Sequence, residues 1–390
     1  MNKKKILAIM LSSMFVLGSL AGCGKKKAET EDASYSVTLT DSSMLDDGSD
    51  VALTKDGMVQ SDLTGEWVTP EQNDKRPIAI TINNIYEALP QSGVEQADVI
   101  FEMLEEGKSV TRLLCVFSNY EDIEQLGPVR SARHYFDRKA MEFDAYFVHW
   151  GYSLYAGNDF DTITDLDHMD LNDQDAAAGF RVSRPGKALE HTGYTSGEKI
   201  VNQLASHDFD STKCASYKKM FYFNMEDKEP EGGSDAKKIT TTFSGGLAPS
   251  FEYDESTKLY KRFEAGGPQI DETTGNQLAF KNVIIQYAPH NFISGDPSGC
   301  IDIPLNGEGE GYYISDGKVI PIKWEKKNTA SFLDYPSLDY LGDTSVRGAE
   351  MGEYGVTQYY TQDGELLKMN PGKTFVTMFP DDNKEGVTIE

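Results

Sequence analysis

Side chains suited to anion binding lie together just after the dipeptide Gly127-Pro128. Arg130 and Ser131 directly precede residues 132–143, whose apolar side chains recur at helical spacing, and Arg133 lies in the first turn of that segment. Ser131 is therefore predicted to cap a helix there. The free N–H groups at a helix start attract anions, and two guanidinium groups would add charge-assisted hydrogen bonds. The segment is a candidate anion- or ligand-binding site. The structural alternative is that these arginines are paired with nearby acids such as Asp98 or Glu102.

Arg112 is a further candidate for this site, and the same acids are its candidate partners. Residues 97–104 and 110–117 are predicted strands of a hairpin. If Leu104 pairs with Val110, Glu102 lies opposite Arg112 in a cross-strand ion pair. A register shift of one residue would turn Arg112 to the other face.

Asp98 and Glu102 could also be considered for acid–base catalysis. They share one face of the predicted strand but lie four residues, or about 13 Å, apart. The carboxyl pairs of glycosidases need a separation of roughly 5 to 9 Å. The two acids are therefore predicted as ion-pair partners, with hydrolytic chemistry as the alternative.

His149 ends a predicted buried strand over residues 145–150. Open α/β sheets bind ligands at strand ends, so His149 is added to the candidate ligand site. The alternative is a half-buried histidine with satisfied hydrogen bonds, since one histidine without a motif is no catalyst. His191 is a weaker candidate. The chain contains no G-x-S-x-G, P-loop or H-E-x-x-H motif, so no catalytic residue is assigned.

An acidic run extends from Asp159 to Asp175. It could offer oxygen ligands to Ca²⁺, but it lacks the glycine and the terminal glutamate of an EF-hand loop. A solvated acidic loop is favoured. We therefore predict no metal and no cofactor.

The elements that position these residues form two patterns. Residues 76–226 mix apolar strands, such as 78–82, with helical segments, such as 132–143 and 195–207. Residues 235–385 show short strands and turns with almost no helical spacing. The predicted fold class is α+β, in which an N-terminal α/β module precedes a mostly antiparallel β module.

The N-terminus resembles a lipoprotein signal. Three lysines precede an apolar stretch over residues 6–20, which ends at Leu20-Ala21-Gly22-Cys23 and is similar to the lipobox read by lipoprotein signal peptidase. The resemblance implies cleavage of residues 1–22 and a diacylglyceryl group on Cys23. Residues 23–75 are polar and are predicted to be a disordered tether.

Composition limits the partners. The chain has 390 residues, a formal net charge of -26 and 39% hydrophobic residues. Its length suits two domains behind an anchor. The acidity argues against nucleic acid and anionic lipid surfaces as partners. Besides Cys23 there are three cysteines without a C-x-x-C spacing, so neither a disulfide framework nor a zinc site is indicated.

Several short motifs resemble the YerB-like lipoproteins, and they extend over nearly all of the chain after the tether. They include Arg76-Pro77-Ile78-Ala79-Ile80, Leu89-Pro90-Gln91-Ser92-Gly93, Gly127-Pro128-Val129-Arg130-Ser131-Ala132-Arg133, Gly266-Gly267-Pro268-Gln269 and Asn370-Pro371-Gly372-Lys373-Thr374. The resemblance implies a two-domain exported lipoprotein of Gram-positive bacteria. It implies no activity and no catalytic residue.

Together these features predict a binding or regulatory lipoprotein of the cell envelope, anchored at the outer face of the cytoplasmic membrane. Its expected partners are the membrane, through the lipid anchor, and an anionic cell-wall ligand or an envelope protein, but no nucleic acid. The alternatives are an envelope hydrolase that uses carboxylate and histidine chemistry, and a purely structural partner of a membrane or wall protein.

Overall fold

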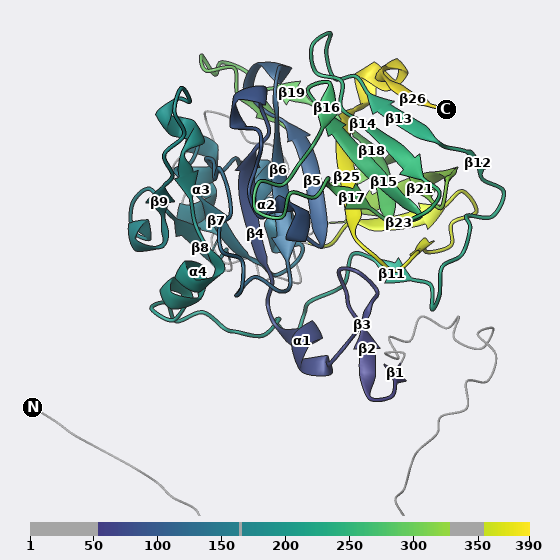
Figure 1. The fold of residues 1–390 in the computed structure, drawn as a ribbon, viewed down its shortest axis with the longest axis horizontal. Coiled ribbons are helices and arrows are strands. Elements are labelled where there is room, and N and C mark those ends of the chain that lie inside the picture. Colours follow the sequence, from purple (N-terminus) through teal and green to yellow (C-terminus); the bar gives the residue numbers. More distant parts are fainter. Residues whose placement is uncertain (1–53, 164–165, 328–354) are drawn as a thin grey trace, which may run out of the picture. The chain divides into compact units, whose positions relative to one another are not determined.

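Strands from both halves of the chain form one large mixed sheet in the computed structural model, which describes residues 54–163, 166–327 and 355–390. Within those ranges the sheet has 11 strands, with β23 (Gln358–Thr361) paired to β22. Figure 1 shows the early strands β4–β6 beside the late strand β25. The order across the sheet is β12 (Ser234–Asp235), β22 (Lys318–Lys326), β21 (Gly307–Ser315), β18 (Asn282–Ala288), β25 (Thr374–Pro380), β5 (Val99–Leu104), β6 (Thr111–Phe117), β4 (Ile78–Asn83), β7 (Tyr146–His149) and β8 (His168–Asp170).

The parallel pairing of β5 with β25 joins the two halves. Val99 lies opposite Thr374, and Phe101 lies opposite Val376. Both strands are buried along their whole length, as expected for apolar runs that are covered on both faces. The predicted modules 76–226 and 235–385 therefore share this sheet, and the position of the boundary between them stays a prediction.

A second sheet of six strands covers part of the first. Phe251 of this sheet packs against Phe375 of β25, with ring centroids 5.1 Å apart. Along β15 (Leu259–Glu264) buried and partly exposed residues alternate. The inward face of that strand carries Arg262 and Glu264 as well as Tyr260, so charged side chains enter the interior. The remaining strands are β16 (Gly267–Pro268), β14 (Ser250–Asp254), β13 (Lys238–Thr241), β26 (Val387–Ile389) and β17 (Ala279–Phe280).

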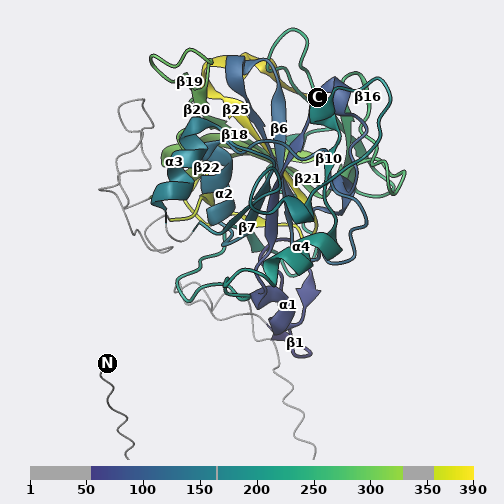
Figure 2. The same cartoon turned by 90° about the vertical axis from the view of Figure 1, so that its left-hand side faces the viewer.

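The longer helices lie around the end of the large sheet that carries β4, β7 and β8. The predicted helix over residues 132–143 is α2 (His134–Met141), which contacts β6, β7 and α3 (Leu154–Thr162). Figure 2 shows α2 and α3 next to each other. The predicted helix over 195–207 is α4 (Gly197–Leu204), capped by Ser196.

The described residues are predominantly β, and the second half fits the expected mostly antiparallel β module. An α/β class for the first module is not confirmed. The reason is the strand direction: β6 is antiparallel to both β4 and β5, whereas β4, β7 and β8 run parallel. Smaller two-stranded pairs complete this part of the chain: β9 (Phe180–Arg181) with β10 (Gly193–Tyr194), β11 (Tyr222–Phe223) with β24 (Lys368–Met369), and β19 (Asn291–Phe292) with β20 (Ile301–Asp302).

The predicted tether is too long at its C-terminal end. Residues 54–75 are ordered: β1 (Thr54–Lys55), β2 (Met58–Gln60) and β3 (Trp67–Val68) form a small sheet, followed by α1 (Pro70–Asp74). Thr69 and Gln72 form a capping box at the start of α1, a local signal that composition alone does not reveal. The predicted signal peptide, Cys23 and the tether up to residue 53 lie outside the described residues. Within the described ranges, no helix has the length and apolarity needed to cross a membrane.

Candidate functional site

The register of the β5–β6 hairpin differs from the predicted one. Leu104 pairs with Thr111, not with Val110, and Met103 lies opposite Arg112. The connection between the strands is residues 105–110, one residue longer than the predicted 105–109, and within it the Glu105 N–H donates to the Val110 carbonyl (2.9 Å). The predicted ion pair between Glu102 and Arg112 is therefore wrong, since the two side chains lie on opposite faces of the sheet.

Glu102 instead binds Arg262 from β15. The Arg262 guanidinium donates to Glu102 Oε1 at 2.8 Å and to Glu264 Oε2 at 3.0 Å, and all three side chains are buried. Its guanidinium carbon lies over the rings of Phe251 and Phe375, at 4.8 and 4.5 Å from their centroids. Glu102 joins the two sheets through this arginine.

Side-chain amides extend the same buried network. Asn84 donates to Glu102 (3.1 Å), while Gln91 and Gln269 each donate to the Asn84 carbonyl oxygen (3.0 and 3.1 Å). Burial raises the pKa of Glu264 to about 7, although Arg262 beside it acts in the opposite direction. Because this network is buried, it stabilises the interior of the fold and is not open to a ligand.

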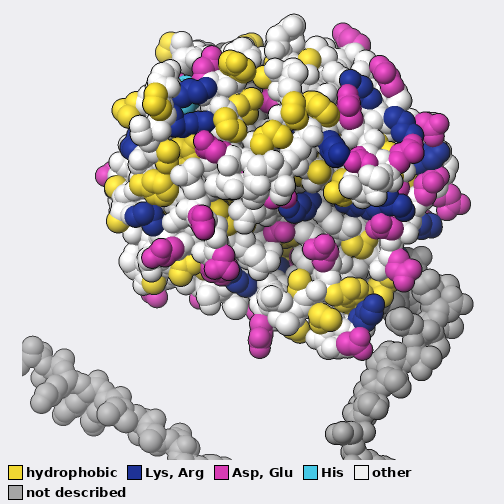
Figure 3. Space-filling model, viewed as in Figure 1, with side chains coloured by type: hydrophobic (Ala, Val, Ile, Leu, Met, Phe, Trp, Pro, Cys, Tyr) yellow, Lys and Arg dark blue, Asp and Glu magenta, His cyan; other side chains and the backbone are white. Residues whose placement is uncertain are grey.

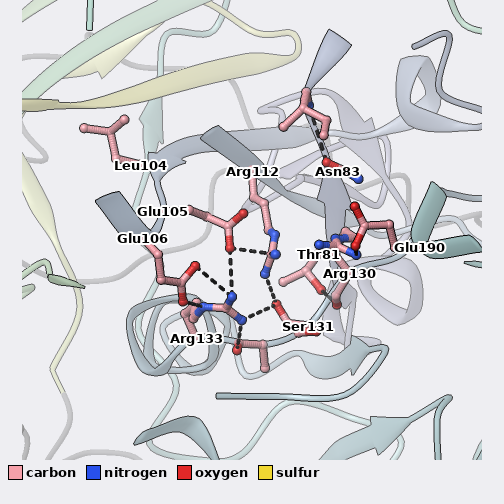
Figure 4. Close-up of polar contacts among 12 residues, drawn as sticks. Thr81, Asn83, Leu104, Glu105, Glu106, Arg112, Arg130, Ser131, Arg133 and Glu190 are labelled. Atoms are coloured by element: carbon pink, nitrogen blue, oxygen red, sulfur yellow. Dashed lines mark hydrogen bonds and ion pairs between the residues drawn. The ribbon is translucent and has the colours of Figure 1, made fainter. Parts of the chain in front are cut away.

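Arg112 and Arg133 converge on the two acids of the hairpin loop, as Figure 4 shows. Glu105 Oε1 lies 2.7 Å from Arg112 Nη2 and 3.0 Å from Arg133 Nη2, and Glu106 is bound by Arg133 through two nitrogens. Burial alone would raise the pKa of Glu106, but the pairing with Arg133 outweighs it and lowers the pKa to about 2. Burial also lowers the pKa of Arg112 to about 10. The charges of Arg112 and Arg133 are therefore neutralised by ion pairs within the protein.

Ser131 is not the helix cap that the sequence predicted. Helix α2 begins two residues later than expected, and the residue at its N-cap position is Arg133, whose side chain makes no capping hydrogen bond. The Ser131 hydroxyl donates to the Trp150 carbonyl (3.1 Å), and the Ser131 carbonyl accepts a hydrogen bond from Arg112 (2.6 Å). The hydroxyl does not cap the helix because it is bound to the Trp150 carbonyl, just after the end of β7.

Arg130 differs from the other two arginines. It points away from them towards Glu190, as Figure 4 shows. Its Nη1 lies 3.5 Å from Glu190 Oε2, the side chains are 22% and 53% exposed, and the buried Arg130 Nε has no hydrogen-bond partner. Glu190 Oε1 lies 3.4 Å from His191 Nε2, and His191 Nδ1 lies 2.9 Å from the Asn83 amide. A carboxylate is thus held loosely between an arginine and a histidine at the surface.

His149 does not join the arginines. It is fully buried, its Nδ1 bonds the Gly151 carbonyl (2.9 Å), and its Nε2 lies 3.1 Å from His168 Nδ1. Asp98 accepts hydrogen bonds from the Ser118 backbone (2.6 Å) and hydroxyl (2.7 Å). His149, Asp98 and Glu102 therefore have separate partners, and the water-accessible, unpaired carboxylate that would favour hydrolysis is found at neither acid.

We expected the acidic run to be a solvated loop, but parts of it are buried. Asp170 accepts the Gly151 and Asn172 N–H groups at 2.7 and 2.9 Å, and Asp175 accepts the Asp170 N–H at 3.0 Å. Both carboxylates are buried and hold the turns that follow β8. The hydrogen-bonding capacity of Asp in turns explains their position better than solvation does.

Two stretches of the chain match the two domain models of one family. Residues 63–210 match the N-terminal domain described as "Protein of unknown function (DUF3048)", and residues 239–339 match the C-terminal domain of the same description. The chain belongs to this family of YerB-like lipoproteins, as its sequence motifs indicated.

The similar proteins include YerB of Bacillus subtilis (strain 168), which is named as a candidate lipoprotein. That protein is 29% identical over 326 residues, which are 83% of this chain and 87% of YerB. The crystal structure of Bacillus subtilis YerB superimposes with a TM-score of 0.68 at 27% identity, and the match covers 85% of this chain and 99% of that one. A lipoprotein relative fits a membrane-anchored place in the envelope.

Several partners in these clusters were not singled out from the sequence: Glu105, Glu106, Glu190 and Arg262. Glu105 and Glu106 were assigned to the hairpin loop, and their proximity in sequence to Arg112 could have marked them as partners. The pairs of Arg262 with Glu102 and of Glu190 with Arg130 carry no local signal, because only the tertiary fold brings these residues together.

Proposed function

We propose that the chain is a binding lipoprotein, anchored through Cys23 at the outer face of the cytoplasmic membrane, and that Arg130 binds an anionic group of an envelope polymer. One observation carries the proposal: of the three arginines of the predicted site, Arg130 is the one without a close, buried ion pair. Its pair with Glu190 is long and half-exposed, and such pairs contribute little, about 0–1 kcal/mol.

The Glu190 carboxylate indicates the ligand chemistry. It lies between Arg130 and His191, where a carboxylate or phosphate of a ligand would find the same two nitrogen groups. A ligand that binds more tightly than Glu190 would displace it at little cost. The net charge of -26 repels an anion at long range, so binding would depend on the local cation Arg130. On the face drawn in Figure 3, basic side chains are interspersed with acidic ones.

The test is a binding titration of the full chain in detergent micelles. One ligand is poly(glycerol phosphate), a second is polyglutamate as a carboxylate polymer, and neutral dextran is the blank. We expect binding to one of the two anionic polymers, and Arg130→Gln weakens it about tenfold, because a charge-assisted hydrogen bond contributes roughly 1.5–3 kcal/mol.

The matched control is Lys258→Ala, which removes a positive charge from an exposed turn far along the sequence. It should change the affinity less than twofold. Equal losses in Arg130→Gln and Lys258→Ala would show that only general electrostatics acts, and the proposed site would be abandoned. No binding to either polymer would have the same consequence.

A further inference from the structure

An open pocket lies beside β8, at the edge of the large sheet, away from Arg130. Its volume is about 360 Å³, within the range of small-molecule sites. Among the described residues that line it, none is Lys or Arg. The lining side chains that matter for its chemistry are Phe160, Asp161, His168, Gln174, His207 and Phe209.

The hydrogen bonds behind the pocket fix the tautomer of His168. A carbonyl can only accept, so the bond between His149 Nδ1 and the Gly151 carbonyl places a hydrogen on Nδ1. Burial lowers the pKa of His149 to about 3, so its ring is neutral and Nε2 is an acceptor. His168 Nδ1 must then donate to His149 Nε2 (3.1 Å).

His168 Nε2 is left with a lone pair on the pocket side. Burial lowers the pKa of His168, although Asp175 and Asp170 oppose the shift, so this ring too is neutral at pH 7. Phe160 stacks on the imidazole with a centroid distance of 3.9 Å and holds it in place. Within the described part of the chain, Nε2 has no hydrogen-bond partner.

His207 is fixed in a similar way from the other side. Its Nε2 lies 2.7 Å from Asp175 Oδ1, a carboxylate oxygen that is fully buried, and its ring stacks on Phe209 at 4.5 Å. Because the carboxylate accepts, Nε2 carries the hydrogen, and this bond fixes the ring at the wall of the pocket.

One unpaired negative charge completes the pocket. Asp167 is neutralised by Arg76 at 2.6 Å, whereas Asp161 forms no ion pair with any residue that the structure describes. Asp161 and His168 both line this pocket. Among the described lining residues, the pocket therefore presents the His168 acceptor and the unpaired Asp161 carboxylate, without a Lys or Arg side chain.

We infer that this pocket binds a small organic cation with a primary ammonium group. An ammonium offers three donors and one charge, which match the His168 lone pair and the Asp161 carboxylate. An anion would meet an acceptor at His168 and a like charge at Asp161. This site shares no residue with the one at Arg130, so it stands without the proposed function.

The test uses calorimetric titration of the full chain with two probes that differ at one nitrogen, which is charged in the first and acetylated and neutral in the second. The first is Nα-acetyl-lysine methylamide, which has a free ε-ammonium, and the second is the same molecule acetylated on the ε-nitrogen. We expect the charged probe to bind at least about tenfold more tightly. Equal affinity for both probes, or no saturable binding of the charged probe up to about 10 mM, would overturn the inference.

Two variants locate the binding. Asp161→Asn should weaken binding of the charged probe at least fivefold. His207→Phe, which keeps the ring stack on Phe209, should weaken this binding less. The control Asp122→Asn removes an exposed acid elsewhere and should have almost no effect. If Asp122→Asn weakens binding as much as Asp161→Asn does, the cation is attracted by the net charge of the protein and the pocket is not its site.

Discussion

Arg262 and Arg130 show two different uses of an arginine in the same chain. Arg262 is fully buried, lies on two aromatic rings and binds two carboxylates within 3.0 Å. Arg130 is partly exposed, with one carboxylate at 3.5 Å and a buried Nε that has no hydrogen-bond partner. Arg262 Nη1 also lacks a hydrogen-bond partner, so burial and the closeness of the carboxylates separate the two roles. An arginine buried between two carboxylates holds the fold together, and a partly exposed one with a single, more distant carboxylate can exchange it for a ligand.

Replacing Arg262 should have the largest effect on stability. Arg262→Met leaves Glu102 and Glu264 buried without their cation, which is expected to lower the free energy of unfolding by about 3–5 kcal/mol. Denaturant titration measures the loss. Adding Glu102→Gln to Arg262→Met should restore part of it, because the variant then buries one carboxylate fewer; a single-variant loss below about 1 kcal/mol would contradict the assigned role.

The interior network should also respond to pH. The pKa of Glu264 is raised from 4.5 to about 7 by burial, so the folded chain holds this proton more tightly than the unfolded chain. The stabilisation is complete below the unfolded pKa and is lost as the pH rises through about 7.

Unfolding of the wild type and of Glu264→Gln at several pH values isolates this contribution. Between about pH 5 and about pH 8 the wild type should lose roughly 2–3 kcal/mol relative to the variant, because the glutamine cannot ionise. Parallel pH profiles of the two proteins would show that Glu264 titrates normally in the folded chain.

At Arg130 the expected changes in stability are small. Arg130→Gln and Glu190→Gln should each alter the free energy of unfolding by less than about 1 kcal/mol, because the pair is long and half-exposed. The same denaturant titrations provide the measurement. A loss of about 3 kcal/mol in either variant would place Arg130 with Arg262 among the residues that hold the fold together.

The elements were largely predictable from sequence, whereas their pairing was not. The β-branched run at residues 78–82 is the strand Ile78–Asn83, and the run at 145–150 is Tyr146–His149, because apolar strands buried on both faces leave a local signal. The register of β5 and β6 was missed by one residue, since it depends on the geometry of a loop and not on the strands.

The candidate site shows the same limit. The sequence singled out Arg112, Arg130 and Arg133, which do lie near one another, but it could not tell which of them would be consumed. The acid that binds Arg262 lies 160 residues away in sequence, and only the tertiary fold brings the two together. His149 does not belong to the arginine cluster, because its side chain bonds His168 instead.

We propose that Glu190 occupies the position that an anionic ligand would take at Arg130. This is tested by the affinity of Glu190→Gln for the anionic polymer that the wild type binds, measured with and without Arg130→Gln. We expect Glu190→Gln to tighten binding about fivefold when Arg130 is present and to have no effect when Arg130 is replaced. Unchanged or weaker binding by Glu190→Gln, or the same gain in both backgrounds, would contradict it.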